Sequence, residues 1–168
     1  MDTYIGTKLV KLLPMSRQAY NDYRGWQLPA NEDGSDEGYL VEYTDGGKPN
    51  DPRHQGYISW SPKAQAEAAY RRTDGLSFGL AIEALKLGKR VARTGWNGKG
   101  MFLFLVAGSR FKVNRPPLLG IYPEGTEIDY HAHIDMKTAQ GYVVPWLASQ
   151  ADMLADDWQI VEAPAAEG

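Results

Sequence analysis

The sequence predicts an α+β protein in which small antiparallel sheets and short helices form two modules. Short runs rich in β-branched and aromatic residues, typical of strands, alternate with short runs whose apolar residues recur at helical spacing. A length of 168 residues allows one ordinary domain or two small ones. The short polar segment 73–75 lies between two helical patterns, so we place the boundary there.

The first module is expected over residues 1–72. Ser16 is a plausible N-cap for a short helix that stops at Gly25, and Ser61 followed by Pro62 resembles the start of a second helix. Two runs rich in Tyr, Val and Ile read as strands. The expected elements are an extended stretch, a helix, two strands and a helix, at residues 3–13, 17–24, 38–44, 56–60 and 62–72.

The second module is expected over residues 76–162. It opens with a helix that Ser77 caps and Gly88 ends. Ser149, with Asp152 three residues later, has the spacing of a capping box. The expected elements are a helix, two strands, an ordered Pro/Gly-rich loop, a hairpin, a helical turn and a strand, at residues 78–87, 89–94, 101–106, 114–125, 130–137 with 141–146, 149–154 and 157–161.

Charge is unevenly distributed along the second module. Residues 84–123 contain eight Lys or Arg and no acid, whereas Lys137 is the only Lys or Arg after Glu124. A basic segment can bind anions, and the acidic one can be its partner within or between subunits; a balanced surface is the simpler reading. The net charge of -3 argues against binding to a DNA or RNA backbone. No apolar run is long enough to span a membrane.

The segment 95–100, GWNGKG, is the most unusual local feature. Its three glycines permit a sharp turn or a close approach to a ligand. Trp96 is suited to stacking on a nucleobase, and Asn97 to hydrogen bonding with its edge. A hairpin turn whose Trp packs on the core is the competing interpretation. The segment is not a phosphate-binding Walker loop, because the spacing differs and no Ser or Thr follows Lys99.

Two further groups have alternative interpretations. His131, His133 and Asp135 would share one face of a strand, where they could bind a metal or form a solvated polar face. The aromatic residues of the first module read either as core and rim or as a carbohydrate platform. They are Tyr20, Tyr23, Trp26, Tyr39, Tyr43, Tyr57 and Trp60.

The second module resembles the phage Thoeris anti-defence family of the second type. The resemblance is carried by SFGLAIEALK at 77–86, GKRVAR at 88–93 and GWNGK at 95–99. It continues with PPLLG at 116–120, HIDMKTA at 133–139 and DMLADDW at 152–158. These motifs span roughly half of the chain and occur in the family's order.

The resemblance implies a non-enzymatic sponge in the cytoplasm of the infected bacterium. Such proteins hold the cyclic ADP-ribose isomer made by a TIR-domain enzyme without cleaving it, so the downstream effector stays silent. They need no cofactor, form homotetramers and share ligand pockets between subunits. Some also bind cyclic oligonucleotides at a separate site.

The expected ligand contacts follow from that ligand's chemistry. Trp96 would stack on the adenine, and Asn97 would bond its edge or a ribose. Cations would pair with the diphosphate, and carboxylates would accept from ribose hydroxyls. The hairpin residues would reach over from a partner subunit. The full set is Arg93, Trp96, Asn97, Lys99, Lys112 or Arg115, Asp135, Met136 and Asp152.

Two other functions remain open at this stage. One is a metal-dependent hydrolase of nucleotide signals that uses His131, His133 and Asp135. The other is a phage structural or adaptor module without a small ligand. The first module resembles small phage modules with a GYLVEY…GYISWSPK pattern and no known role, and is not part of the smallest sponges.

Overall fold

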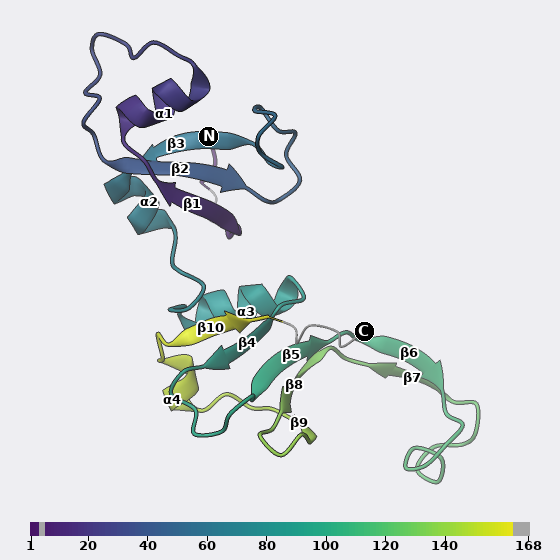
Figure 1. Ribbon diagram of the computed structural model, residues 1–168. Coiled ribbons are helices and arrows are strands. Elements are labelled where there is room, and N and C mark those ends of the chain that lie inside the picture. Colours follow the sequence, from purple (N-terminus) through teal and green to yellow (C-terminus); the bar gives the residue numbers. More distant parts are fainter. Residues whose placement is uncertain (4–5, 163–168) are drawn as a thin grey trace, which may run out of the picture. The chain divides into compact units, whose positions relative to one another are not determined.

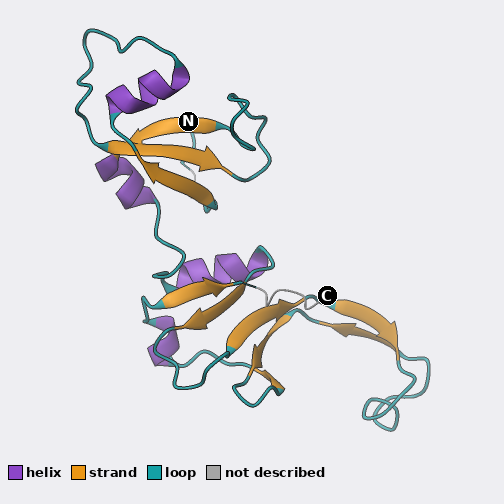
Figure 2. Cartoon of the chain, viewed as in Figure 1, coloured by secondary structure: helices purple, strands orange, loops and turns teal. Residues whose placement is uncertain are grey.

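The computed structural model describes residues 1–3 and 6–162. The chain forms two compact units, residues 1–71 and the part that begins at Arg72 (Figure 1). Figure 2 shows that each unit combines helices with antiparallel strands, which confirms the predicted fold class. None of the described helices has both the length and the apolar character that crossing a membrane requires.

The first unit is a three-stranded antiparallel sheet with two helices. The sheet has the order β1-β2-β3, and Tyr20 of the first helix packs with Leu40 and Ile58 in its core. The second helix contacts β2 and β3, where Ala66 is buried. The elements are β1 Val10–Pro14, α1 Arg17–Arg24, β2 Gly38–Tyr43, β3 Ile58–Pro62 and α2 Lys63–Ala69.

The ends of α1 follow the predicted capping pattern. The Ala19 N–H donates to Ser16 Oγ at 3.2 Å, which satisfies one of the unpaired donors of the first turn. Gly25 adopts a left-handed conformation with φ 69°, where a side chain would be strained. The extended stretch expected at 3–13 appears as β1, beginning at Val10; Tyr4 and Ile5 lie outside the described residues.

The predicted cap of the next helix is wrong. Ser61 and Pro62 pair with Tyr39 and Gly38, so β3 continues through Pro62 and the helix begins one residue later. Pro62 is the N-cap, and no side chain there bonds the helix. The cross-strand ladder therefore takes precedence over the local Ser-Pro signal.

The second unit is built on a five-stranded antiparallel sheet of order β10-β4-β5-β8-β9, with a separate two-stranded ribbon, β6-β7. Helix α3 contacts β10, β4 and β5. The elements are α3 Phe78–Lys86, β4 Arg90–Arg93, β5 Phe102–Val106, β6 Ser109–Lys112, β7 Glu127–Tyr130, β8 His133–Lys137, β9 Val143–Pro145, α4 Gln150–Met153 and β10 Trp158–Val161.

Trp158 is the centre of the second unit's core. Its side chain is fully buried, and it packs with apolar residues of α3, β4 and β5. The rings of Phe78, Trp96 and Trp146 surround it at centroid distances of 5.7, 5.5 and 6.0 Å. Packing of these aromatic side chains in one cluster stabilises the second unit.

The region between β5 and β8 differs from the prediction. Residues 130–137 are not one strand: Tyr130 ends β7, and β8 begins at His133. The chain leaves the main sheet after β5 and returns through the ribbon β6-β7, which the sequence did not predict. A Cβ on Gly108 would lie 2.9 Å from the Tyr130 carbonyl oxygen, so glycine permits this close crossing. The predicted hairpin with the following strand is confirmed as β8-β9.

Candidate functional site

The turn between β4 and β5, residues 94–101, contains the GWNGKG segment. The Gly95 N–H donates to Asp157 Oδ2 at 2.7 Å. A Cβ on Gly95 would lie 2.8 Å from the same oxygen, so the close approach requires glycine. Gly100 has φ 69°, which reverses the chain into β5. Glycine therefore sets both ends of this turn.

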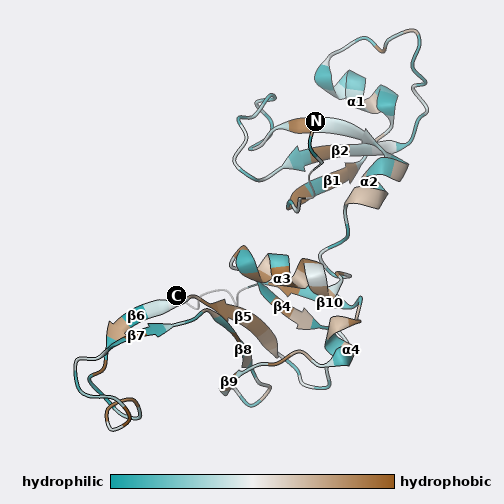
Figure 3. Cartoon of the chain, turned by 180° about the vertical axis from the view of Figure 1, so that it is seen from behind, coloured by the Kyte–Doolittle hydropathy of each residue, from teal (hydrophilic) through white to brown (hydrophobic). Residues whose placement is uncertain are grey.

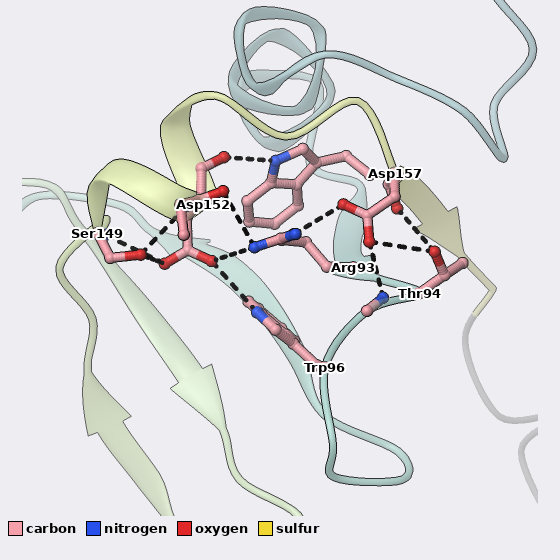
Figure 4. A network of polar contacts seen from close by, with 9 residues as sticks. Arg93, Thr94, Trp96, Ser149, Asp152 and Asp157 are labelled. Carbon is pink, nitrogen blue, oxygen red and sulfur yellow. Dashed lines mark hydrogen bonds and ion pairs between the residues drawn. The ribbon is translucent and has the colours of Figure 1, made fainter.

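Arg93, the last residue of β4, joins the turn to the C-terminal part of the unit (Figure 4). Its Nε donates to Asp157 Oδ1 at 2.7 Å, and its Nη1 to Asp152 Oδ1 at 3.0 Å. Thr94 Oγ1 lies 3.2 Å from Asp157 Oδ2. One guanidinium thus bridges the helix α4 and the residue that precedes β10.

Asp152 accepts hydrogen bonds from several directions. Its Oδ2 accepts from the Ser149 N–H at 3.1 Å and from Ser149 Oγ at 2.7 Å, which confirms the predicted capping box. Its Oδ1 accepts from Arg93 and also from Trp96 Nε1 at 3.3 Å. The carboxylate is thereby occupied by groups of its own unit.

These contacts shift the pKa values of the charged groups. Hydrogen bonds that the Arg93 guanidinium donates to Asp157 and Asp152 raise its pKa. Burial of the Asp152 carboxyl favours its neutral form, but hydrogen bonds from Ser149 and Arg93 outweigh burial and lower its pKa. The hydrogen bond from Arg93 is the main cause of the lowered pKa of Asp157. The network is therefore charged at neutral pH.

Trp96 is partly buried and belongs to the core cluster. Its indole meets that of Trp158 edge-to-face, with an interplanar angle of 77°. The hydrogen bond to Asp152 fixes the ring's polar edge. The structure therefore combines two features that the sequence left as alternatives, a glycine-rich turn and an indole packed on the core.

Asn97 and Lys99 lie on the exposed part of the same turn. Within residues 1–3 and 6–162, neither side chain forms a hydrogen bond or an ion pair. Both are therefore available to a ligand at this surface.

Asp135 and Met136 are adjacent on β8 and point to opposite faces of the sheet. Met136 packs against the core cluster. Asp135 lies opposite Phe104 of β5 on the other face, where its Oδ2 is 3.8 Å from His133 Nε2. Figure 3 shows that β5 is strongly hydrophobic, whereas β8 alternates hydrophobic with hydrophilic residues. No helix described in this unit packs on the face that carries Phe104 and Asp135.

Arg115 lies away from the turn. It follows β6 in the loop between the two ribbon strands, which Figure 1 shows at the opposite end of the unit from the β4–β5 turn. There it lines a hollow of about 300 Å³ together with Phe111, Leu118 and Tyr130. Lys112 is exposed at the end of β6. Arg93, Trp96, Asn97, Lys99 and Asp152 are thus brought together, whereas Arg115 and Lys112 are separate.

The histidine pair does not form the predicted strand face, because His131 precedes β8. The ring Nδ1 of His133 lies 3.0 Å from the His131 carbonyl oxygen. In the part of the chain that the structure describes, no group of three or more His, Asp or Glu side chains is placed to hold a metal ion.

Asp157 is the member of this network that the sequence analysis missed. It contacts Arg93 and Gly95, which lie 64 and 62 residues earlier. No local motif signals such a contact. Only the pairing of β10 with β4, which places Trp158 opposite Arg93, brings Asp157 to the turn.

Comparison with known proteins identifies the second unit. A family model described as the Thoeris anti-defense 2-like domain matches residues 76–161. The chain is also 43% identical over 86 residues to the protein of Bacillus phage SP01 named Thoeris anti-defense 2, over 51% of this chain and 94% of that protein. The chain therefore belongs to the Thoeris anti-defense 2-like family.

Proposed function

We propose that this chain is a phage anti-defence protein that binds and sequesters a TIR-made cyclic ADP-ribose isomer without cleaving it. The supporting observation is the family match, which spans every strand and helix of the second unit. The SP01 relative is named Thoeris anti-defense 2, and 94% of its length corresponds to this region. Activation of the downstream effector would be blocked because the signal stays bound.

The β4–β5 turn is the proposed ligand surface. A cyclic ADP-ribose isomer presents a flat adenine, ribose hydroxyls and a diphosphate. Trp96 offers a stacking ring, Lys99 a cation for phosphate and Asn97 an amide for the base edge or a ribose. Asp152 and Arg93 already bond each other, so their proposed role is to hold the turn. A rigid turn loses little conformational entropy when the ligand binds.

The proposed assembly is a homotetramer that shares its ligand pockets between subunits. The sheet face that carries Phe104 and Asp135 is apolar in part, and none of the helices described in this unit covers it. A second copy on this face would bring Asp135 to a neighbour's ligand. Cyclic oligonucleotides at another site of the assembly remain part of the same proposal.

A capture-and-release assay tests sequestration. The full chain is incubated with a lysate that contains the TIR-made signal, and the filtrate is assayed for effector activation before and after boiling the protein fraction. We expect activity to disappear and then return with boiling. Permanent loss would indicate cleavage and overturn the sponge, while no loss would leave an adaptor role. Ligand at 100 times its Kd should also add about 2.7 kcal/mol of stability.

Variants of the turn test the contacts. Trp96→Ala should abolish capture because the stacking ring is lost, and unchanged capture would refute that role. Because Trp96 also packs on the core, the melting temperature of the Trp96→Ala variant must be measured alongside capture. Lys99→Ala, at an exposed position, should weaken capture by roughly tenfold or more. Lys89→Ala is the matched control, since Lys89 is exposed at the other end of β4.

A further inference from the structure

The first unit contains an open hollow that lies outside the family region. It has a volume of about 390 Å³ and is bounded by α1, the loop after α1 and β3. Small-molecule sites typically measure roughly 300–1,000 Å³. All of its lining residues lie between Arg17 and Trp60, so the hollow belongs to the first unit alone.

Two tryptophans with stacked arginines form much of its wall. The Arg17 guanidinium lies 4.2 Å from the ring centroid of Trp60, and that of Arg24 lies 4.3 Å from the Trp26 ring. Trp26 as a whole residue is nevertheless 52% exposed. Large exposed aromatic side chains beside arginine are the usual means of holding a flat, electron-rich ring.

The charges around Arg24 leave a surplus cation. Asp51 is the carboxylate near Arg24, with 3.7 Å between Asp51 Oδ2 and Arg24 Nε, and it also pairs with Arg53 at 2.6 Å. Two guanidiniums thus share one carboxylate. Arg24 otherwise donates to neutral acceptors, the Tyr20 hydroxyl and the Asn50 carbonyl. By contrast, Arg17 has two carboxylate partners of its own, Glu32 at 2.6 Å and Asp36 at 3.4 Å. An anion would therefore be attracted to the Arg24 side.

Asn21 adds a polar group on the same wall. The residue is only 8% exposed, and its Nδ2 donates to the Arg17 carbonyl oxygen at 2.9 Å. No hydrogen bond to its Oδ1 is found within the described residues, although the residue lines the hollow. The carbonyl of a fixed amide is a suitable acceptor for an amino or hydroxyl group of a ligand.

We propose that this hollow binds a nucleotide, with the base against Trp26, the phosphate beside Arg24, and Asn21 accepting a hydrogen bond from the base or ribose. A neutral sugar would use the aromatic wall but not the surplus cation. Inorganic phosphate would use the cation but not the wall. A base joined to a phosphate uses both. This site is independent of the proposed function, which belongs to the other unit.

Binding of nucleoside monophosphates to the full chain tests the proposal. AMP, GMP, CMP and UMP are titrated separately by calorimetry, with adenosine and inorganic phosphate as the half-ligands. We expect at least one monophosphate to bind, and each half-ligand to bind at least tenfold more weakly. Absence of binding by all four up to about 1 mM would overturn the proposal. Equal binding of phosphate alone would reduce the site to an anion site and overturn it as well.

Substitutions locate the binding. Trp26→Ala should reduce affinity at least tenfold, and Trp26→Phe, which keeps an aromatic ring, should recover part of the loss. Tyr142→Ala removes a similarly exposed aromatic from the second unit and should bind as the unchanged chain does. Full affinity in a folded Trp26→Ala protein would place the nucleotide elsewhere and refute the site.

The two proposals can fail separately. The titrations contain no TIR-made signal, so a chain that binds nucleotides but captures no signal retains this site and loses the proposed function. A chain that captures the signal but binds no monophosphate loses only this site.

Discussion

Arg93 illustrates how one side chain can fix a functional surface without belonging to its exposed part. It pairs in register with the buried Trp158, yet it carries a charge. Two carboxylates, Asp152 of α4 at 3.0 Å and Asp157 before β10 at 2.7 Å, neutralise it. A buried or half-buried cation is tolerated only with such partners. The cost of removing either carboxylate is therefore larger than for an ordinary surface ion pair.

Replacing Asp157 with Asn should destabilise the second unit at neutral pH. Arg93 would lose an ionic hydrogen bond, and the loss should be about 1–2 kcal/mol because the pair is partly exposed. The pKa of Asp157 is lowered in the fold. Its stabilising effect is therefore complete above the ordinary carboxyl pKa near 3.8 and disappears as the pH falls through the folded value.

Urea unfolding at neutral pH and near pH 3 measures this difference. The difference in unfolding free energy between the unchanged chain and the Asp157→Asn variant should be smaller near pH 3 than at neutral pH. A difference in unfolding free energy that stays constant with pH would contradict the role of the ionised carboxylate. Asp156→Asn is the control, because Asp156 is exposed and directly adjacent.

At the scale of elements, local signals predicted the helices well and the strands unevenly. The boundaries of α1 and the capping box of α4 depend on groups within four residues, so the sequence reveals them. The end of β3 depends on pairing with β2, which overrides Ser61. All four residues of β6 are exposed, so this strand has no alternation of apolar and polar residues to detect.

The same distinction applies to the candidate site. Trp96 and its neighbours stood out because glycines surround an aromatic residue, and the structure brings Arg93 and Asp152 to them. Arg115 seemed equivalent by charge, but the unpredicted ribbon carries it away. Residue type thus identified candidates, whereas contacts between distant segments determined which of them share a surface.

The ribbon β6-β7 should depend on one buried side chain. Val113 is 1% exposed, and its N–H and carbonyl bond to Thr126 and Gly125 across the base of the loop. Val113→Ser would remove apolar contacts and place a hydroxyl there. We expect faster hydrogen exchange at residues 113–126 and unchanged protection of β4 and β10.

Arg110→Gln serves as the comparison for that variant. Arg110 pairs with Asp129 and Glu127 on the exposed surface of the ribbon, where ion pairs contribute little. Hydrogen-exchange rates in the Arg110→Gln variant should match those of the unchanged chain. An equal increase in hydrogen exchange at residues 113–126 in both variants would mean that surface ion pairs, and not the burial of Val113, stabilise the loop.

At the scale of the whole molecule, the family region coincides with one of the two compact units. The SP01 relative is matched over 94% of its length by these 86 residues. That relative is therefore too short to contain a counterpart of residues 1–71. Because the family match and the second compact unit cover nearly the same residues, we propose that residues 1–72 and 76–162 are separate domains.

A shortened chain that begins at Arg72 should keep the ability to capture the signal. Its core and the β4–β5 turn are formed within the unit. The capture-and-release assay provides the measurement, with the full chain at equal concentration as the reference. Loss of capture in a folded shortened chain would show that the first unit contributes to the signal site.

The start and the finish of the family region lie beside each other. Leu76 exchanges two backbone hydrogen bonds with Trp158, at 2.7 and 3.1 Å, and the Ile160 N–H donates to the Thr73 carbonyl at 2.8 Å. Because its natural ends are adjacent, this fold is suited to circular permutation. A short peptide could join them, and new termini could open in the exposed loop beyond β6, leaving the tryptophan-centred interior uncut.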